Sequence, residues 1–457
     1  MIPLTDRDWR PAAAGAALAA FWYAGLITGF DFDLLRNDHR GLLFNAMLLN
    51  MLQGRFDVPP AIIGEEGFLH AGLVYAYFGI FPALLRLPLL LHPAAFGTDI
   101  TKLSSVFAAA LAVYWQLRAI SLLRVRLAGT PAEALTLALA IGVIFGGPHA
   151  QFMRSSIYEE VMHWAMGFAA LFVWQALRGL DQGFSLTILA RLGLAAGLAF
   201  ITRVSTGAGL IAALGGLLLV LSWPGGWRPL AWLQAALSRR FLIPVAIVAP
   251  FVAITLGVNW ARWGNPLVVI DLAAHIMNAR YPDRLPRILA TGEFNLTRVP
   301  FGLMYYFAPV WPLYWPGGGL MFQAYQQRMV EAELPPASFL LTDPVMLVLA
   351  GLFVARARRM GAAALTLAAG LLLPVALMLG LVFMNFRYRQ EFYPLLLFAA
   401  LAALLRTTPP MALRRHAMTL TWISVAFAHG FLVLYLLSRF GPADVTVVQV
   451  LLRRLGF

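Results

Sequence analysis

Long runs of apolar residues, separated by short polar segments, dominate the sequence and set the fold class. Hydrophobic residues make up 61% of the 457-residue chain, charged residues make up 12%, and the mean hydropathy is +0.76. A helix of about 18–20 apolar residues crosses the hydrocarbon core of a bilayer, and many of the runs reach that length. A soluble protein usually carries about twice this share of charged residues. The sequence therefore predicts an all-α polytopic membrane protein.

We expect about 11 transmembrane helices in a single membrane-embedded domain that covers residues 1–457. The predicted helices cover residues 12–30, 100–122, 133–147, a segment that ends near 178, two helices on either side of 202–203 within 186–221, and then 241–260, 344–355, 361–383, 392–405 and 417–437. Two long loops, residues 31–99 and 262–343, are expected to contain helices that lie in the membrane interface.

Arginines in alternate short loops predict the orientation of the chain. The cytoplasmic groups are Arg7, Arg10, Arg118, Arg124, Arg126, Arg178, Arg228, Arg239, Arg240, Arg356, Arg358, Arg359, Arg406, Arg414 and Arg415. Cytoplasmic loops are enriched in basic residues, so the N-terminus is expected inside and both long loops outside. The net charge of +13 suits anionic lipid, since the sequence has no soluble basic domain that could bind nucleic acid. The lack of cysteine excludes disulfides and thiolate sites.

The expected outer face carries carboxylates and arginines close to the ends of predicted helices. They are Asp31, Asp33, Asp38, Glu65, Glu66, Glu159, Glu160, Arg36, Arg40, Arg154, Arg203, Arg387 and Arg389. Ionisable groups near bilayer depth are costly and usually face a cavity. A carboxylate can take a proton from an attacking hydroxyl, and arginines can hold a phosphate as its charge develops. The set therefore predicts phosphate chemistry at the outer membrane surface.

The segment "RNDHRGLLFNAMLLNMLQGRFDV" follows the first apolar run. Asp38 and Asn45 are seven residues apart and would share one face of a helix, with leucines and methionines facing the membrane. Pro59 and Pro60 would end that helix. We interpret the segment as an interfacial helix that presents Asp38 beside Arg40, and the alternative is a simple helix start capped by residue 37 or 38.

Three other groups have both a structural and a functional interpretation. Arg203 lies in an apolar stretch, where an unpaired arginine costs at least about 2.5–3.5 kcal/mol, so it either binds phosphate or sits in a hairpin turn at the interface. Arg387 is four residues from Glu391 and could form an ordinary helical ion pair, whereas Arg389 has no such neighbour and is the better phosphate candidate.

Glu159 and Glu160 share a helix face with His163, and this spacing indicates a hydrogen-bonded histidine rather than a metal site. The sequence does not indicate whether the protein binds a metal ion. The segment 65–93 is aromatic and broken by prolines. An aromatic belt at the interface explains its tyrosines, including Tyr77, better than it explains Glu65 and Glu66.

The order of these segments resembles the GT-C superfamily of integral-membrane glycosyltransferases, which includes lipid A aminoarabinose transferases and protein mannosyltransferases. The matching stretches are "NDHRGLLFNAMLLNMLQGR", "RSSIYEEVMHWAMGF", "GLAFITRVSTG", "GEFNLTRVPFGLMYYFAP" and "NFRYRQEFYPLLLF". The resemblance covers about residues 10–405, and the order of the motifs is its specific part. The resemblance implies a GT-C-like fold with Asp38 as the catalytic base. It implies substrate contacts by Arg40, Glu66, Tyr77, Glu159, Glu160, Arg203, Arg387, Tyr388 and Arg389.

The resulting expectation is a glycosyltransferase of a bacterial inner membrane with its active site facing the periplasm. It would move a sugar from a polyprenyl-monophosphate donor to a hydroxyl on a glycan, lipid or protein acceptor, with inversion at the anomeric carbon. The sequence identifies no cofactor, and a divalent cation is optional. The alternative is a transporter or flippase for an anionic lipid or a sugar phosphate, and a weaker one is a scaffold for envelope assembly.

Overall fold

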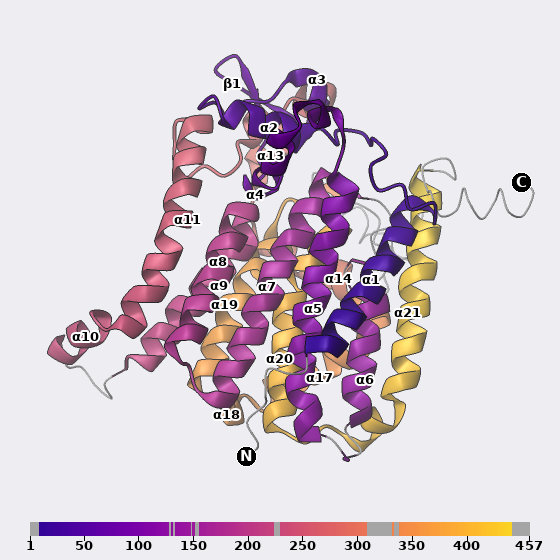
Figure 1. The fold of residues 1–457 in the computed structure, drawn as a ribbon, viewed down its shortest axis with the longest axis vertical. Coiled ribbons are helices and arrows are strands. Elements are labelled where there is room, and N and C mark those ends of the chain that lie inside the picture. Colours follow the sequence, from indigo (N-terminus) through magenta and orange to yellow (C-terminus); the bar gives the residue numbers. More distant parts are fainter. Residues whose placement is uncertain are drawn as a thin grey trace, which may run out of the picture.

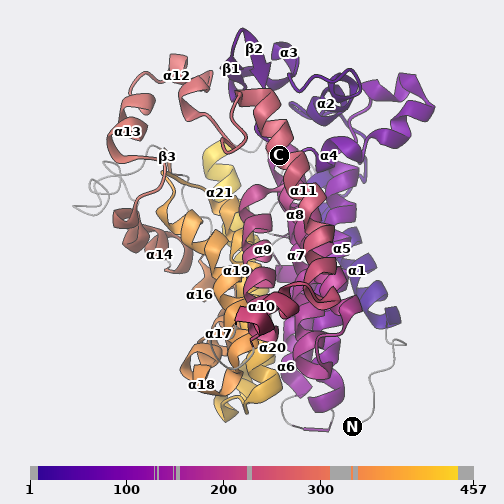
Figure 2. The ribbon, with the colours of Figure 1, turned by 90° about the vertical axis from the view of Figure 1, so that its left-hand side faces the viewer.

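The computed structural model describes residues 9–127, 129–130, 133–147, 149–150, 155–223, 229–308, 331–332 and 338–440. Arg154 and the last segment of the chain lie outside these residues. Within them the protein is almost entirely helical, with two very small sheets, which confirms the predicted all-α class. Figures 1 and 2 show a bundle of long helices beneath a layer of short elements.

The long helices coincide with the predicted apolar segments. They are α1 (Trp9–Thr28), α5 (Thr101–Leu127), α6 (Glu133–Ile141, continued by the π-turn η5, Gly142–Gly146), α7 (Ile157–Gln182), α8 (Leu186–Thr202), α9 (Val204–Leu221), α11 (Arg239–Trp263), α17 (Pro344–Ala355), α19 (Ala362–Gly380), α20 (Tyr393–Arg406) and α21 (Met411–Phe440). Five of these helices are long and apolar enough to cross a membrane, namely α1, α5, α9, α11 and α19. The chain is a multi-pass membrane protein, and the number of eleven spans stays a prediction.

The layer above the bundle, which we call the outer layer, is built from the two long loops (Figure 1). The first loop contributes α2 (Leu43–Met51), α3 (Pro60–Ile63), η2 (Gly64–Glu66), the antiparallel strands β1 (Phe68–His70) and β2 (Leu73–Tyr75), α4 (Phe81–Leu84), η3 (Leu87–Leu91) and η4 (Pro93–Gly97). The second loop contributes η6 (Leu272–Ala274), α12 (Met277–Arg280) and α13 (Arg284–Thr291). Its later elements, η7 (Leu296–Arg298) and α14 (Val299–Phe307), pack against α19 in the bundle.

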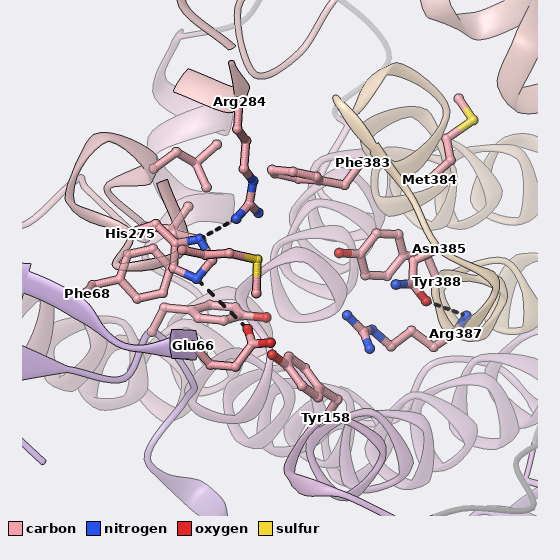
Figure 3. Close-up of a pocket in the computed structure, with 14 residues that line it drawn as sticks. Glu66, Phe68, Tyr158, His275, Arg284, Phe383, Met384, Asn385, Arg387 and Tyr388 are labelled. Carbon is pink, nitrogen blue, oxygen red and sulfur yellow. Dashed lines mark hydrogen bonds and ion pairs between the residues drawn. The ribbon is translucent and has the colours of Figure 1, made fainter. Parts of the chain in front are cut away.

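Several short elements connect or extend the long helices. They are α10 (Pro229–Ala236), β3 (Glu331–Ala332), α16 (Phe339–Thr342), α18 (Ala357–Met360), β4 (Phe383–Met384) and η9 (Phe386–Glu391). Strands β3 and β4 pair in parallel. The 3₁₀ helix η9 follows β4 directly and leads into α20, so its side chains lie where the outer layer meets the bundle (Figure 3).

The first loop is fixed to the bundle by a buried ion pair. The Arg86 guanidinium, at the start of η3, donates to both carboxylate oxygens of Glu160 on α7, with a 2.8 Å bond to Oε2. Both side chains are fully buried. Arg86 also donates to the side-chain oxygen of Asn45 on α2, and the Asn45 amide donates to the carbonyl oxygens of Phe96 and Thr98. These bonds satisfy polar groups that would be costly if buried alone.

The predicted interfacial helix is shorter than expected. It begins at Leu43 with Leu42 as its N-cap residue, so Asp38 lies before the helix and does not share a face with Asn45. No side chain caps this helix, and it ends at Met51, well before Pro59. Asn45 is buried and donates hydrogen bonds to carbonyl oxygens later in the first loop, so it is not exposed beside Asp38.

Candidate functional site

A cavity of about 190 Å³ lies where both long loops meet η9 and the start of α7. Its polar lining residues are Glu66, Tyr77, Tyr158, His275, Arg284, Asn385, Arg387 and Tyr388. Figure 3 shows that these side chains converge on one space from opposite sides, with the second loop on one wall and η9 on the other. The cavity therefore combines carboxylate, imidazole, phenol and guanidinium groups from segments far apart in the sequence.

One wall is a chain of polar contacts that begins at Arg40. The Arg40 guanidinium lies 3.6 Å from Oε1 of Glu66, and the Nε2 atom of His275 lies 3.9 Å from Oε2 of the same carboxylate. On its other side, Nδ1 of His275 accepts a hydrogen bond of 2.8 Å from Arg284. The acceptor role of Nδ1 requires a neutral imidazole that carries its proton on Nε2.

Burial and charge both keep this histidine neutral. Burial and the nearby Arg284 guanidinium together lower the pKa of His275 to about 4, although the Glu66 carboxylate opposes this shift. The ring also stacks on Phe68 of β1, with ring centres 4.5 Å apart. His275 thus serves as a fixed neutral bridge between a carboxylate and a guanidinium.

Sequence spacing does not predict His275 or Arg284 as site residues. Both lie in the second loop, outside any spacing pattern that predicts a site. A weak signal is present, because Asp283 precedes, and Arg284 begins, the amphipathic helix α13. The buried position of Arg284, which is 9% exposed and whose guanidinium lies 5.0 Å from the ring centre of Phe383, depends on contacts between the second loop and β4.

The opposite wall carries Arg387 and Tyr388. The Asn385 side chain accepts a hydrogen bond from the backbone of Arg387 and so caps the start of η9. The Arg387 guanidinium lies 4.1 Å from the ring centre of Tyr158 and 5.8 Å from that of Tyr388, distances at which a cation is attracted to an aromatic face. Burial raises the pKa of Tyr77 well above its usual range, so this phenol stays protonated and can donate a hydrogen bond.

Three successive residues of η9 hold this wall in place by reaching three different parts of the bundle. Arg389 donates to Thr342, the last residue of α16, at 2.6 Å and to Asp343, the N-cap residue of α17, at 3.3 Å. Gln390 donates to Nδ1 of His163 on α7 at 2.9 Å. Glu391 accepts from Arg203, between α8 and α9, as well as from two hydroxyls on α9.

The structure brings together some of the predicted site residues. Glu66, Tyr77, Arg387 and Tyr388 line the cavity. Two further arginines touch its lining, since Arg40 pairs with Glu66 and the Arg203 guanidinium lies 5.5 Å from the ring centre of Tyr388. The break between α8 and α9 occurs at Arg203, as the hairpin interpretation predicts.

The other predicted residues do not line the cavity. Asp38 is half-exposed and pairs with Lys102, whose Nζ lies 3.1 Å from Oδ2, at the start of α5. Glu159 accepts a hydrogen bond from Ser156 at the start of α7. Glu160 is fully buried against Arg86.

Arg389 and Glu391 both pair with residues far away in the sequence. Arg389 is buried against Asp343. The helical pair between Arg387 and Glu391 is replaced by the pair between Arg203 and Glu391. Among the described residues, no group of three or more histidine, aspartate or glutamate side chains is arranged to hold a metal ion.

Comparisons with known proteins show a likeness to a solved structure. No protein-family model and no curated protein matches the chain. The archaeal oligosaccharyltransferase AglB from Archaeoglobus fulgidus, solved with an inhibitory peptide and a dolichol-phosphate, is similar over 96% of this chain and 56% of AglB, at 16% identity and a TM-score of 0.41. This chain thus spans about half the length of AglB. The case for a function rests on the residues of the cavity.

Proposed function

We propose that the protein is a GT-C type glycosyltransferase that uses a polyprenyl-monophosphate sugar as donor. The observation that carries the proposal is the cavity itself, in which Arg284 and Arg387 face Glu66 at the junction between the outer layer and the bundle. A lipid phosphate needs cationic donors at the membrane surface, and guanidinium groups bind it through paired hydrogen bonds. The bundle beside the cavity offers an apolar environment for the polyprenyl chain.

The reaction balances without a cofactor. A carboxylate takes the proton of the acceptor hydroxyl, and the hydroxyl oxygen forms a bond with the anomeric carbon from the face opposite the phosphate. The bond between that carbon and the phosphate oxygen breaks, and its electron pair stays on the phosphate. The arginines stabilise the added charge on the leaving group, so no general acid is needed and the anomeric configuration inverts.

Asp38 is the base that we propose from the sequence, and its surroundings suit that role. Its carboxylate is half-exposed, so an acceptor can reach it, and Lys102 beside it offers a cation for a phosphate oxygen. It lies two residues from Arg40, which connects it to the cavity through Glu66. Glu66 is the second candidate for the base, because its carboxylate lines the cavity directly.

Three matched variants test the function and separate the two carboxylates. We expect D38N to lower turnover at least about 100-fold, the usual contribution of general base catalysis, while undecaprenyl phosphate still binds. E66Q should weaken binding of that lipid phosphate, because Glu66 orients Arg40 and His275. E65Q is the control, since Glu65 is exposed and pairs with Arg280 away from the lining residues.

Turnover is measured by mass spectrometry of envelope glycans from cells that carry each variant in place of the wild-type gene, and lipid binding by native mass spectrometry. If E66Q abolishes the product and D38N does not, the base is Glu66. A product that persists in both variants excludes the enzyme proposed here.

A bacterial inner membrane with the cavity on the periplasmic face is part of the proposal. The alternative, a transporter or flippase for an anionic lipid or sugar phosphate, makes a different prediction. A transporter moves its substrate without changing it, so the envelope glycans of a deletion strain would keep their masses but change sides of the membrane. Labelling of lipid-linked sugars by a membrane-impermeant reagent distinguishes the two outcomes.

A further inference from the structure

A second cleft lies between α1 and α6, with α5 as its floor. It has a volume of about 790 Å³, within the range of about 300–1,000 Å³ that is typical of small-molecule sites. The N-terminal end of α1, the C-terminal end of α5 and the start of α6 line it, so the cleft lies away from the outer layer and from the cavity described above (Figure 1).

The cleft has one charged end. Arg124 lies in the last turn of α5, and Glu133 is the first residue of α6. The Arg124 side chain is exposed and is held by no hydrogen bond or ion pair within the described part of the chain. One oxygen of Glu133, Oε2, accepts a hydrogen bond of 3.0 Å from the backbone of Gly129, and this bond fixes the carboxylate at the mouth of the cleft.

Beyond this end the lining offers no free polar side chain within the described residues. Ser121 and Thr136 also line the cleft, but the hydroxyl of each donates to a carbonyl oxygen of its own helix, at 2.8 Å and 2.7 Å. The remaining wall is formed by small and aliphatic residues such as Gly15, Leu117 and Ile144. Leu117 and Arg124 are seven residues apart, which corresponds to roughly 10 Å of helix length. The cleft therefore offers an elongated apolar space below a charged mouth.

We propose that this cleft binds a glycerophospholipid whose head group carries a primary amine, of the phosphatidylethanolamine type. The lipid phosphate pairs with Arg124, the ammonium group donates to Glu133, and one acyl chain fills the apolar space. The opposite charges of Arg124 and Glu133 match a zwitterion, whereas the Glu133 carboxylate repels a purely anionic head group. A choline head group has no N–H to donate to Glu133, so it is recognised less well.

The test uses the full-length protein in detergent and native mass spectrometry with three added lipids, phosphatidylethanolamine, phosphatidylcholine and phosphatidylglycerol, of identical acyl chains. We expect a one-to-one adduct with phosphatidylethanolamine at concentrations at least about tenfold lower than with the other two, which corresponds to about 1.4 kcal/mol. R124Q and E133Q should each remove this preference. A134F, which places a ring in the cleft, should remove the adduct.

R191Q is the matched control, because Arg191 is exposed on α8 and does not line the cleft. It should bind phosphatidylethanolamine as the wild type does. Equal binding of all three lipids, or stronger binding of phosphatidylglycerol, overturns the assigned head group. An adduct that survives R124Q, E133Q and A134F alike places the lipid elsewhere, and the absence of any adduct in the wild type refutes the site.

Discussion

The ion pair between Arg203 and Glu391 should couple the stability of the bundle to the shape of the cavity. The Glu391 side chain is 1% exposed and that of Arg203 is 16% exposed. Besides Arg203, Glu391 accepts hydrogen bonds of 2.6 Å from Ser205 and 2.7 Å from Thr206. A carboxylate so enclosed cannot exchange its partner for water when Arg203 is removed.

The expected loss of stability depends on whether one or both members of the buried ion pair are replaced. Removing one partner of a buried ion pair leaves an uncompensated charge and costs about 3–5 kcal/mol, whereas replacing both by apolar side chains is often neutral. We therefore expect E391M and R203M each to lower the free energy of unfolding by about 3 kcal/mol or more. The double variant should lose at least about 2 kcal/mol less than the sum of the two single variants.

The assay is unfolding in mixed micelles of increasing denaturing detergent, followed by the fluorescence of the 13 tryptophans. Binding of undecaprenyl phosphate to each folded variant is measured in parallel, because Arg387 and Tyr388 share η9 with Glu391. The same cycle at the exposed pair of Arg280 and Glu65 is the control and should show no coupling. Additive losses at Arg203 and Glu391, within about 0.5 kcal/mol, would falsify the reasoning.

Two further predictions concern the outer layer. A Cβ atom at Gly79 would lie 2.3 Å from the carbonyl oxygens of Ile201 and Thr202, so G79A should destabilise the protein by about 1–3 kcal/mol. G97A is the control. No atom lies near a Cβ at this position, so the unfolding midpoint should not change. His275 should titrate with a pKa of about 4 in histidine-selective NMR spectra of the folded protein. In the unfolded chain this histidine binds a proton near pH 6.5, whereas in the folded protein it stays neutral down to about pH 4. The free energy of unfolding should therefore fall by about 3 kcal/mol as the pH drops from 6.5 to 4. A folded-state pKa near 6.5 would contradict the buried neutral imidazole.

The positions of the long helices follow from the sequence because they depend on local composition. Apolar runs alone locate the helices, and a charged residue within such a run marks the break at Arg203. In the folded protein the carboxylate of Glu391 compensates the charge of this arginine. Features of this kind belong to short stretches of chain and can be recognised without tertiary structure.

The site was only partly predictable because its charges pair across the bundle. Local spacing suggested a pair between Arg387 and Glu391, but Glu391 bonds to Arg203, which is 188 residues away in the sequence. Glu160 was expected at the substrate and is instead neutralised by Arg86, 74 residues away. Helical periodicity reports neighbours on one helix and carries no information about which helices pack together, so such partners emerge only from the fold.

Because η9 is attached to three parts of the bundle, it is a poor place to change the substrate selectivity of the cavity. Exchanging residues 386–391 with those of another protein would break three buried contacts at once, so the transplanted hexapeptide would be mispositioned even if its own sequence were ideal. On the facing wall, His275 contacts Glu66 and Phe68 of the first loop, and Arg284 contacts Phe383, so this wall is held by the outer layer and β4 rather than by the long helices. Efforts to alter selectivity should therefore randomise the second-loop wall and leave the hexapeptide intact.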